Sequence, residues 1–373
     1  MKKIPPLDLT RQYGAIATEV NAAVAEVLAS GRYIGGSKVD EFEEKFAAYL
    51  HTPHCVSCNS GTDALFLALR AFEVGPGHEV ITTPFTFFAT AETISAVGAK
   101  PVFVDIYPQT FNLDLDGLEK AITPQTRAII AVHIFGQPMD MTRLMAIARR
   151  HNLIVIEDCA QAAGAEWAAE KVGTIGHAGC FSFFPTKNLG AFGDGGALVT
   201  KDEAIASRVR MLKNHGQSGK YYSEQIGINS RLDALQAAIL SVKLPFLDRW
   251  NDRRRALADR YYRLLSELPG VIPPRELLGG RCVWHQYTIQ VSDRPRDEVA
   301  EGLQKQGIAS MVYYPVSLHL QPVYRSLGYR PGQFPAVERI CDRVLSLPIF
   351  PELSDLEQEQ VVHGLKDCLT KEF

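Results

Sequence analysis

The feature of the sequence that most limits the possible folds is a series of short apolar runs separated by helical patterns. Two of these runs, AIIAV (residues 128–132) and LIVIE (153–157), are apolar at nearly every position. Strands of this kind belong to a sheet that helices cover on both faces. Helical spacing of apolar residues occurs between such runs, at 87–98 and 141–151. The alternation predicts an α/β fold with a doubly wound, mainly parallel sheet.

Other segments follow the same scheme. Gly31 and Pro53 mark the ends of two helical patterns near the N-terminus. Residues 54–72 indicate a short strand, a turn and an Ala/Leu-rich helix. We expect helices at 17–30 and 39–50 and further strands at 78–83, 101–106, 179–184 and 196–200.

The pattern changes after about residue 245. Residues 249–270 have the spacing of a charged amphipathic helix, and an alternating strand at 284–292 and a helix at 296–307 follow. A chain of 373 residues is long enough for two domains. We therefore expect a large α/β domain over residues 1–245, including an N-terminal helical segment, and a smaller α+β domain over 246–373.

The composition argues against several classes of function. The chain is 46% hydrophobic and has a formal net charge of −3, without the basic excess of a nucleic-acid-binding protein. The apolar run 128–136 is too short to span a membrane, and no apolar signal segment follows the N-terminal lysines. Seven cysteines, an odd number, are typical of reduced thiols. We expect a cytoplasmic protein without nucleic-acid or membrane partners.

Cys55 and Cys58 form a C-x-x-C pair that could indicate a zinc or redox site. A structural zinc site would need a second pair at matching spacing, and none follows. In a thioredoxin-type pair the helix would open directly after the strand, whereas here it opens later, after residues 59–62. We interpret the pair as two small buried side chains and expect no metal site.

Ligands of open α/β sheets bind at the carboxyl ends of the strands, and three groups of polar residues are expected there. The first group is Ser60, Gly61 and Thr62, at the start of the helix that ends near residue 72. Free backbone N–H groups and the helix dipole make such a position suitable for an anion. An alternative is a plain helix cap, because serine, threonine and aspartate are preferred there.

The second group is Glu157 and Asp158, which end a buried strand. A carboxylate at such a place costs several kcal/mol, by order of magnitude, unless it is paired, and a protonated ring nitrogen is one suitable partner. Capping of the next turn is the alternative.

The third group is Lys187, in the stretch FSFFPTKNLGAFGDGG (181–196). A lysine at a strand end among glycines and apolar walls would have its pKa lowered by desolvation and could form a Schiff base. The alternative is a lysine held by a salt bridge. The three groups together supply an anion cup, an acidic partner and an amine. Pyridoxal 5′-phosphate (PLP) is the cofactor that needs all three.

The chain resembles, over nearly its full length, the fold-type I PLP-dependent aminotransferases of the DegT/DnrJ/EryC1/StrS family. The order and spacing of eight blocks carry the resemblance. These are SGRYIGG, NSGTDAL, TPFTFFATAETI, GAKPVFVDI, IEDCAQAAGA, FSFFPTKNLGAFGDGGA, GINSRLDALQAAIL and YYPVSLHLQPVY.

The resemblance implies a role for each matching cofactor residue. Lys187 matches the lysine that holds the cofactor, and Asp158 matches the partner of its pyridine nitrogen. It also implies four further cofactor contacts: an aromatic ring that stacks on the cofactor ring, a residue near its phenolic oxygen, a serine that binds the phosphate, and an asparagine that reaches the phosphate from the neighbouring subunit. These are Phe87, Gln161, Ser182 and Asn229, respectively.

For the substrate, the resemblance implies Arg231 at the subunit interface, facing an anionic part of the substrate. A structural ion pair of Arg231 with Asp233 or Glu224 is the alternative. Tyr33 is a further substrate candidate, beside two glycines that allow close backbone approach.

Tyr313, Tyr314 and His319 are implied at the mouth of the sugar pocket. Many relatives have His-Tyr-Pro where this chain has Tyr-Tyr-Pro, which puts one sugar contact in doubt. His319 could instead be a packed core histidine.

The implied reaction transfers an amino group from L-glutamate to a nucleotide-linked 3- or 4-keto-sugar, in a homodimer with shared active sites. The sequence leaves the pathway open between the synthesis of a surface polysaccharide and that of a secreted glycoside. Two alternatives remain. Related sugar dehydratases have histidine in place of the lysine, and Lys187 argues against this activity. A non-catalytic regulator would have a DNA-binding appendage or a basic patch, and the only notable basic stretch, at 252–263, is interrupted by acids and aromatic residues.

Overall fold

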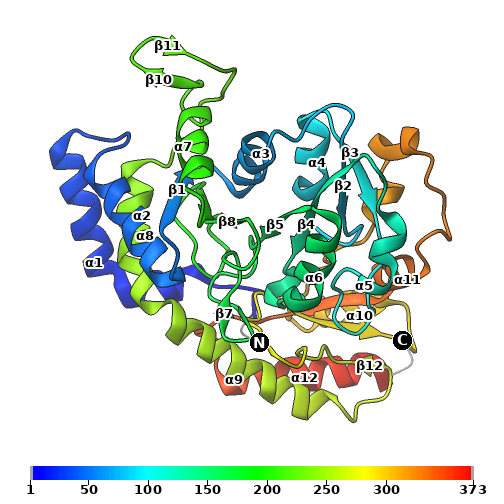
Figure 1. Cartoon of the computed structure of the whole chain (residues 1–373). Coiled ribbons are helices and arrows are strands. Elements are labelled where there is room, and N and C mark those ends of the chain that lie inside the picture. The colour runs from blue at the N-terminus through cyan, green and yellow to red at the C-terminus, as the bar shows by residue number, and fades with distance from the viewer. Residues whose placement is uncertain (1–2, 371–373) are drawn as a thin grey trace.

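The computed structural model describes residues 3–370, and its centre is a seven-stranded sheet (Figure 1). Six of the strands point the same way, and only β9 runs antiparallel to both of its neighbours. The predicted doubly wound, mainly parallel sheet is therefore confirmed. In spatial order the strands are β1 (His54–Cys58), β9 (Gly196–Thr200), β8 (Ala178–Ser182), β5 (Ile154–Asp158), β4 (Thr126–Val132), β2 (Glu79–Thr82) and β3 (Lys100–Phe103).

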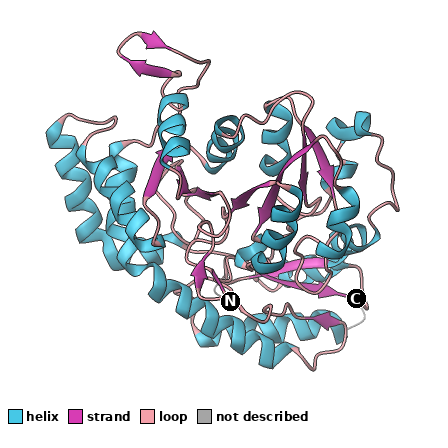
Figure 2. Cartoon of the chain, viewed as in Figure 1, coloured by secondary structure: helices cyan, strands magenta, loops and turns pink. Residues whose placement is uncertain are grey.

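Helices cover both faces of this sheet (Figure 2). In β4, Ile129 and Ala131 pack into the core on one face, whereas Ala128 and Ile130 pack into the core on the other. This alternation explains why the run is apolar throughout. One face is covered by α2 (Ser37–Leu50), α6 (Met141–His151) and α8 (Ala234–Lys243), and the other by α3 (Gly61–Ala71), α4 (Ala89–Ala96), α7 (Glu203–Leu212) and α11 (Pro335–Arg343).

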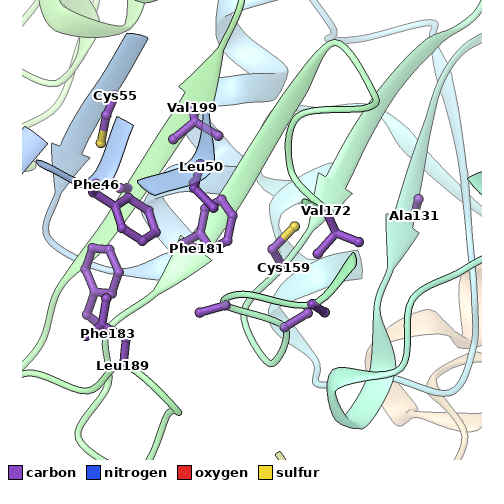
Figure 3. Packing of buried hydrophobic residues seen from close by; sticks show 14 of the residues in the cluster. Phe46, Leu50, Cys55, Ala131, Cys159, Val172, Phe181, Phe183, Leu189 and Val199 are labelled. Atoms are coloured by element: carbon purple, nitrogen blue, oxygen red, sulfur yellow. The ribbon is translucent and has the colours of Figure 1, made fainter. Parts of the chain in front are cut away.

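Aromatic side chains fill the first of these cores. Phe46 from α2 contacts Phe181 and Phe183 edge to face, at ring-centroid distances of 5.1 and 5.3 Å. Figure 3 shows these rings next to Leu50 and Val199. The chain that leads from β8 to Lys187 is thus anchored by Phe181 and Phe183, six and four residues before the lysine, so the loop starts from a rigid base.

The N-terminal helix α1 (Leu9–Ser30) begins eight residues earlier than predicted. Asp8 caps it by accepting a hydrogen bond from the backbone N–H of Thr10, a signal that the sequence interpretation missed. The predicted end is confirmed, since Gly31 adopts a left-handed conformation with φ of 65°. The helix packs against α8 at the side of the molecule (Figure 1).

A second, separate core lies in the C-terminal third, where helices pack on a small antiparallel sheet. Ile4, near the start of the chain, also packs into this core and pairs with Ile308. The division at residues 245 and 246 stays a prediction. The sheet contains β12 (Val271–Ile272), β14 (Tyr287–Val291) and β15 (Val344–Leu347), and the helices are α9 (Leu247–Leu265), α10 (Arg296–Lys305) and α12 (Asp355–Thr370).

The remaining elements are short. A second small sheet contains β6 and β7, which precede α9 in the chain, and β13, which follows α9 and pairs with β6. A hairpin of β10 and β11 projects from the top of the molecule (Figure 1). The bounds are α5 (Leu115–Leu118), β6 (Glu166–Trp167), β7 (Glu170–Lys171), β10 (Gln217–Gly219), β11 (Tyr222–Ser223) and β13 (Gly280–Arg281).

Cys55 and Cys58 are buried free thiols on opposite faces of the sheet. They lie three positions apart on β1, so their side chains point to different cores and cannot meet. The interpretation as two small buried side chains is confirmed. Among residues 3–370, no helix has the length and apolar character needed to cross a membrane.

Candidate active site

A cavity of about 630 Å³ opens at the carboxyl edge of the central sheet. Polar residues were predicted at this edge, and members of all three predicted groups line the cavity. Its walls are the N-terminus of α3, the loop after β2, the ends of β4, β5 and β8, the loop that carries Lys187, and two C-terminal segments at 285–286 and 313–314.

Strand β5 separates the two carboxylates that the sequence places side by side. Asp158 lines the cavity, whereas Glu157 points to the other face and is fully buried. Glu157 accepts hydrogen bonds from the backbone N–H groups of Gly173, Ile175 and Gly176 at 2.7–2.9 Å. His133 lies 2.9 Å from the same carboxylate. The acceptor sites of Glu157 are therefore used within the fold, and Asp158 is the carboxylate available to a ligand.

Asp158 is almost fully buried, and burial raises the pKa of its carboxyl group. Hydrogen bonds from Thr90 Oγ1 at 2.8 Å and from the backbone N–H of Ala160 at 3.2 Å oppose this rise. Because it accepts the bond from Ala160, Asp158 also caps the turn that follows β5, which was the alternative role considered for it. Asp158 thus caps this turn and lines the cavity at the same time. A buried carboxylate with few protein donors is a suitable partner for a cationic ring nitrogen.

Lys187 lies in a tight turn after β8 and lines the same cavity. Its backbone N–H donates to the carbonyl of Phe184 at 2.8 Å. A Cβ atom at Gly190 would lie 2.3 Å from the carbonyl oxygen of Pro185, so only glycine allows the turn to close. Burial lowers the pKa of the Lys187 amine to about 8, and the charge of Asp158 opposes this shift.

Within the described residues, Lys187 makes no salt bridge, and the alternative of a structural ion pair has no support there. An amine whose pKa is near neutrality is a good nucleophile and proton carrier.

The N-terminus of α3 faces the cavity. Ser60 is the N-cap, and its Oγ accepts from the backbone N–H of Asp63 at 3.1 Å. The backbone N–H groups of Gly61 and Thr62 have no hydrogen-bond acceptor among residues 3–370 and are free for an anion. Ser182 lies so close that a Cβ at Gly61 would be 2.7 Å from its Cβ. The cap and the anion site are thus the same structure.

Aromatic and amide side chains line the remaining walls. Phe87 has an exposed ring at the cavity, with a ring-centroid distance of 6.5 Å to Tyr314. Gln161 accepts from the backbone N–H of Phe135 at 2.6 Å and donates to Tyr314 Oη at 3.2 Å. Tyr313 also lines the cavity. These four predicted residues are brought together with Asp158 and Lys187 by segments far apart in the sequence.

The structure does not bring Tyr33, Asn229 and Arg231 to the cavity of the same chain. Tyr33 and Asn229 are exposed, and Arg231 has no ion pair with Asp233 or Glu224 within the described residues. Tyr33 and Arg231 belong to neighbouring segments, since the carbonyl of Tyr33 accepts from the backbone N–H of Ala234 at 2.8 Å.

His319 is also away from the cavity, at 2% exposure. Its Nδ1 lies 2.6 Å from Ser317 Oγ and its Nε2 3.2 Å from Glu338 Oε1. The ring of Phe334 packs edge to face on it at 4.8 Å. Both nitrogens are occupied, so the geometry favours the packed core histidine over the substrate ligand.

These elements can be compared with known proteins. A model of the DegT/DnrJ/EryC1/StrS aminotransferase family matches residues 15–366. The chain belongs to this family. It is 51% identical to a "Pleiotropic regulatory protein" of Geobacillus stearothermophilus, over 98% of each chain. It is 44% identical to the dTDP-3-amino-3,4,6-trideoxy-alpha-D-glucose transaminase of Streptomyces venezuelae, over 98% of this chain and 96% of the relative.

Solved structures of the family agree with the fold. DesV of S. venezuelae, in complex with a ketimine intermediate, has a TM-score of 0.97 and 44% identity, and each chain is covered completely. NtdA of Bacillus subtilis, with bound cofactor PMP, has a TM-score of 0.93 and 33% identity over all of this chain and 86% of NtdA. The predicted fold-type and family are therefore confirmed.

In this member of the DegT/DnrJ/EryC1/StrS family, the cavity contains histidines that the sequence interpretation missed. His133 and His285 both line it. A histidine directly after the apolar run of β4 is a signal that could have identified His133. His285 has no comparable local signal, because its hydrogen-bond partner, Asn188, is 97 residues earlier in the chain.

Proposed function

We propose that this family member is a PLP-dependent aminotransferase that acts on a nucleotide-linked keto-sugar and takes the amino group from L-glutamate. The observation that carries the proposal is one cavity holding a lysine amine with a pKa lowered to about 8 and a buried carboxylate. An amino-transfer site needs this combination of a neutral amine and an anionic partner for the ring nitrogen.

The residues present fit PLP. The free N–H groups of Gly61 and Thr62, with the hydroxyls of Ser60 and Ser182, would hold the phosphate. Asp158 would hold the ring nitrogen in its protonated form. Phe87 and Gln161 would contact the ring and its phenolic oxygen, as predicted from the sequence. Asn229 would contribute from the neighbouring subunit. When bound, the cofactor supplies an electron-withdrawing ring that stabilises negative charge on the reacting carbon.

Lys187 would act as the general acid–base of the reaction. A neutral amine at this place can accept a proton from the substrate carbon and return it to another atom of the same site. Burial keeps a substantial neutral fraction near pH 7 to 8, because the pKa is about 8 rather than 10.5. Asp158 opposes complete loss of the proton, so the amine can carry out both directions of the transfer.

Two relatives bear on the substrate class. The S. venezuelae enzyme is named a dTDP-sugar transaminase. A second relative, 45% identical over 98% of each chain, is the "UDP-N-acetyl-3-dehydro-alpha-D-glucosamine 3-aminotranferase" of Acidithiobacillus ferrooxidans. Both names describe amino transfer to carbon 3 of a nucleotide sugar. We propose a 3-keto-sugar ahead of a 4-keto-sugar, with Tyr313, Tyr314 and Arg231 as contacts.

A homodimer with shared active sites would bring the distant residues to the cavity. Apolar side chains remain exposed in the monomer beside these residues, including Tyr33, Ile34 and Phe192. Phe192 contacts the exposed Tyr13 of α1 edge to face at 5.9 Å. A surface with several exposed apolar side chains is typical of a subunit interface. The seven free thiols are in accord with the proposed cytoplasmic location.

The regulator alternative, raised from the sequence, is also suggested by the name of the Geobacillus relative, and it needs a basic surface. The basic stretch at 252–263 does not provide it, because four of its five arginines are engaged within the fold. Arg253 pairs with Asp355, Arg255 with Glu276 and Arg260 with Glu359, and Arg254 is buried against backbone carbonyls. The dehydratase alternative requires another residue at position 187.

The test is borohydride reduction of the PLP-loaded protein followed by peptide mapping, with visible spectra before and after L-glutamate. We expect a phosphopyridoxyl mass on the peptide with Lys187 and a spectral change with glutamate. A screen of 3-keto and 4-keto nucleotide sugars then identifies the acceptor. An unmodified Lys187 in folded, loaded protein would contradict the proposal. A modified Lys187 without response to any amino donor would retain the cofactor and exclude amino transfer.

A further inference from the structure

His285 is a buried histidine of the cavity to which the proposed chemistry assigns no role. It lies two residues before the start of β14, is 5% exposed, and lines the same cavity as Lys187. Its Nδ1 is 3.1 Å from Oδ1 of Asn188, the residue that follows Lys187. The ring is therefore tied to the turn that positions the reactive lysine.

Hydrogen bonds of Asn188 determine which nitrogen of His285 carries the proton. Asn188 Nδ2 is 2.9 Å from the carbonyl oxygen of Val283 and 2.8 Å from Oδ1 of Asn251. A carbonyl oxygen only accepts, so the amide nitrogen of Asn188 must face Val283. Its Oδ1 then faces His285 and can only accept. His285 Nδ1 must therefore be the protonated nitrogen.

The surroundings of His285 keep the ring neutral. Burial lowers the pKa of the imidazole, and the charges of Lys187 and of the buried Arg254 guanidinium lower it further. Arg254 Nη1 donates to the carbonyl oxygens of Trp284 and Ile349 at 3.2 and 2.9 Å, which holds the cation beside the ring. A neutral ring protonated at Nδ1 has a lone pair at Nε2. Within the described residues this Nε2 has no hydrogen-bond partner.

We infer that His285 is a positioning residue whose Nε2 lone pair accepts a hydrogen bond from the free amine of Lys187 and directs that amine in the cavity. Lys187 Nζ has no hydrogen-bond acceptor within residues 3–370, so both groups lack a partner. Asn188 links the two, because it adjoins Lys187 in the chain and fixes the ring. The inference rests on the proposed function only in taking Lys187 as the reactive amine.

The first test is the tautomer of His285, measured by nitrogen NMR on full-length protein labelled with ¹⁵N-histidine. The resonance is assigned by comparison with His285→Gln. We expect an unprotonated Nε2 and a protonated Nδ1 at pH 7, and loss of this single tautomer in Asn188→Ala. A protonated Nε2 in the wild-type protein would overturn the inference.

The second test is competitive labelling of lysines with acetic anhydride over pH 6–10, read by peptide mass spectrometry on cofactor-free protein. His285→Leu removes the acceptor, whereas His285→Gln retains one. We expect the pH midpoint of Lys187 labelling to fall by about half to one pH unit in the leucine variant. In the glutamine variant, this midpoint should fall by less than about 0.3 pH units. The labelling rate at pH 7 would rise about 3- to 10-fold with leucine.

Two controls separate this effect from changes in burial or folding. Val132→Leu adds apolar bulk to the cavity wall without removing an acceptor, and we expect it to lower the labelling midpoint of Lys187 by less than His285→Leu does. Lys243, a second buried lysine with a pKa lowered to about 8, reports on the fold in the same digest. Equal midpoints in the leucine and glutamine variants, with Lys243 unchanged, would overturn the inference. Neither test requires turnover, so a failure of amino transfer is recognised separately.

Discussion

Thr90 Oγ1 donates a hydrogen bond of 2.8 Å to Asp158 Oδ2, and this bond connects α4 to the carboxylate of the cavity. Because Thr90 uses its single proton for Asp158, the 3.0 Å contact with Thr86 Oγ1 must be donated by Thr86. The two hydroxyls thus form a directed chain that ends on Asp158. Such bonds favour the ionised carboxylate and oppose the effect of burial.

Thr90→Val tests this chain. The variant conserves the shape of the side chain but removes a donor, so the pKa of Asp158 should rise further and PLP should bind about 5- to 20-fold more weakly. The dissociation constant is measured by absorbance titration of cofactor-free protein. Thr93→Val is the matched control, because Thr93 is equally buried on α4 and donates only to the carbonyl of Thr90. Equal affinities of the two variants would contradict the assigned role of Thr90.

The pKa of Lys187 predicts the pH dependence of cofactor capture. The neutral amine is the nucleophile, so the capture rate should fall about tenfold per pH unit below pH 8 and level off above it. Asp158→Asn should move the midpoint of this rate–pH profile to lower pH, since the charge of Asp158 raises the pKa of the Lys187 amine. Stopped-flow absorbance measures the rate, and Asp194→Asn is the control carboxylate of the cavity. A midpoint above pH 10 would show that Lys187 is not desolvated.

The sequence was sufficient to predict the mainly parallel sheet and the reactive residues at the ends of its strands. Apolar runs such as β4 are local patterns, and parallel strands place the residues that follow them at one edge. Lys187, Asp158 and the start of α3 were therefore predicted together. Strand periodicity alone shows that Glu157 and Asp158 face opposite sides. It does not show which side has the cavity, because this depends on the helices that cover each face.

Other features depend on contacts between distant segments, which the sequence alone does not reveal. The role of His319 is decided by Phe334 and Glu338, which follow it by 15 and 19 residues and enclose its ring. His285 depends on Asn188 in the same way. The early start of α1 is a different case, since Asp8 and Thr10 form a cap that is visible in the sequence.

The ion pair of Arg11 with Glu357 predicts an acid-dependent loss of stability. Arg11 on α1 donates to both carboxylate oxygens of Glu357 on α12, at 2.6 and 2.9 Å, and lowers the pKa of Glu357 from 4.5 to about 2. A carboxyl group with a depressed folded pKa stabilises the fold above its unfolded pKa, and this contribution is lost as the pH falls from about 4.5 through about 2.

Glu357→Gln should therefore lower the free energy of unfolding by about 1–2 kcal/mol at pH 7 and by progressively less below pH 4. Urea unfolding at pH 7 and at a pH below 4 measures the change in the free energy of unfolding. Glu359→Gln removes an exposed pair on the same helix and should cost less than about 1 kcal/mol. A difference between wild type and Glu357→Gln that does not depend on pH would contradict the assigned pair.

Mixed dimers test whether Asn229 completes the cavity of a neighbouring subunit. Asn229 is exposed and outside the cavity of its own chain, so its loss would impair only the partner's site. Lys187→Ala and Asn229→Ala, each inactive alone, would form a heterodimer with one intact and one doubly altered site. We expect purified heterodimers to regain about half of the wild-type activity. The control pair is Lys187→Ala with Asp158→Ala, whose residues lie in one chain's cavity and should restore nothing. Heterodimers of the first pair that are as inactive as the control would show that each chain's site is complete by itself.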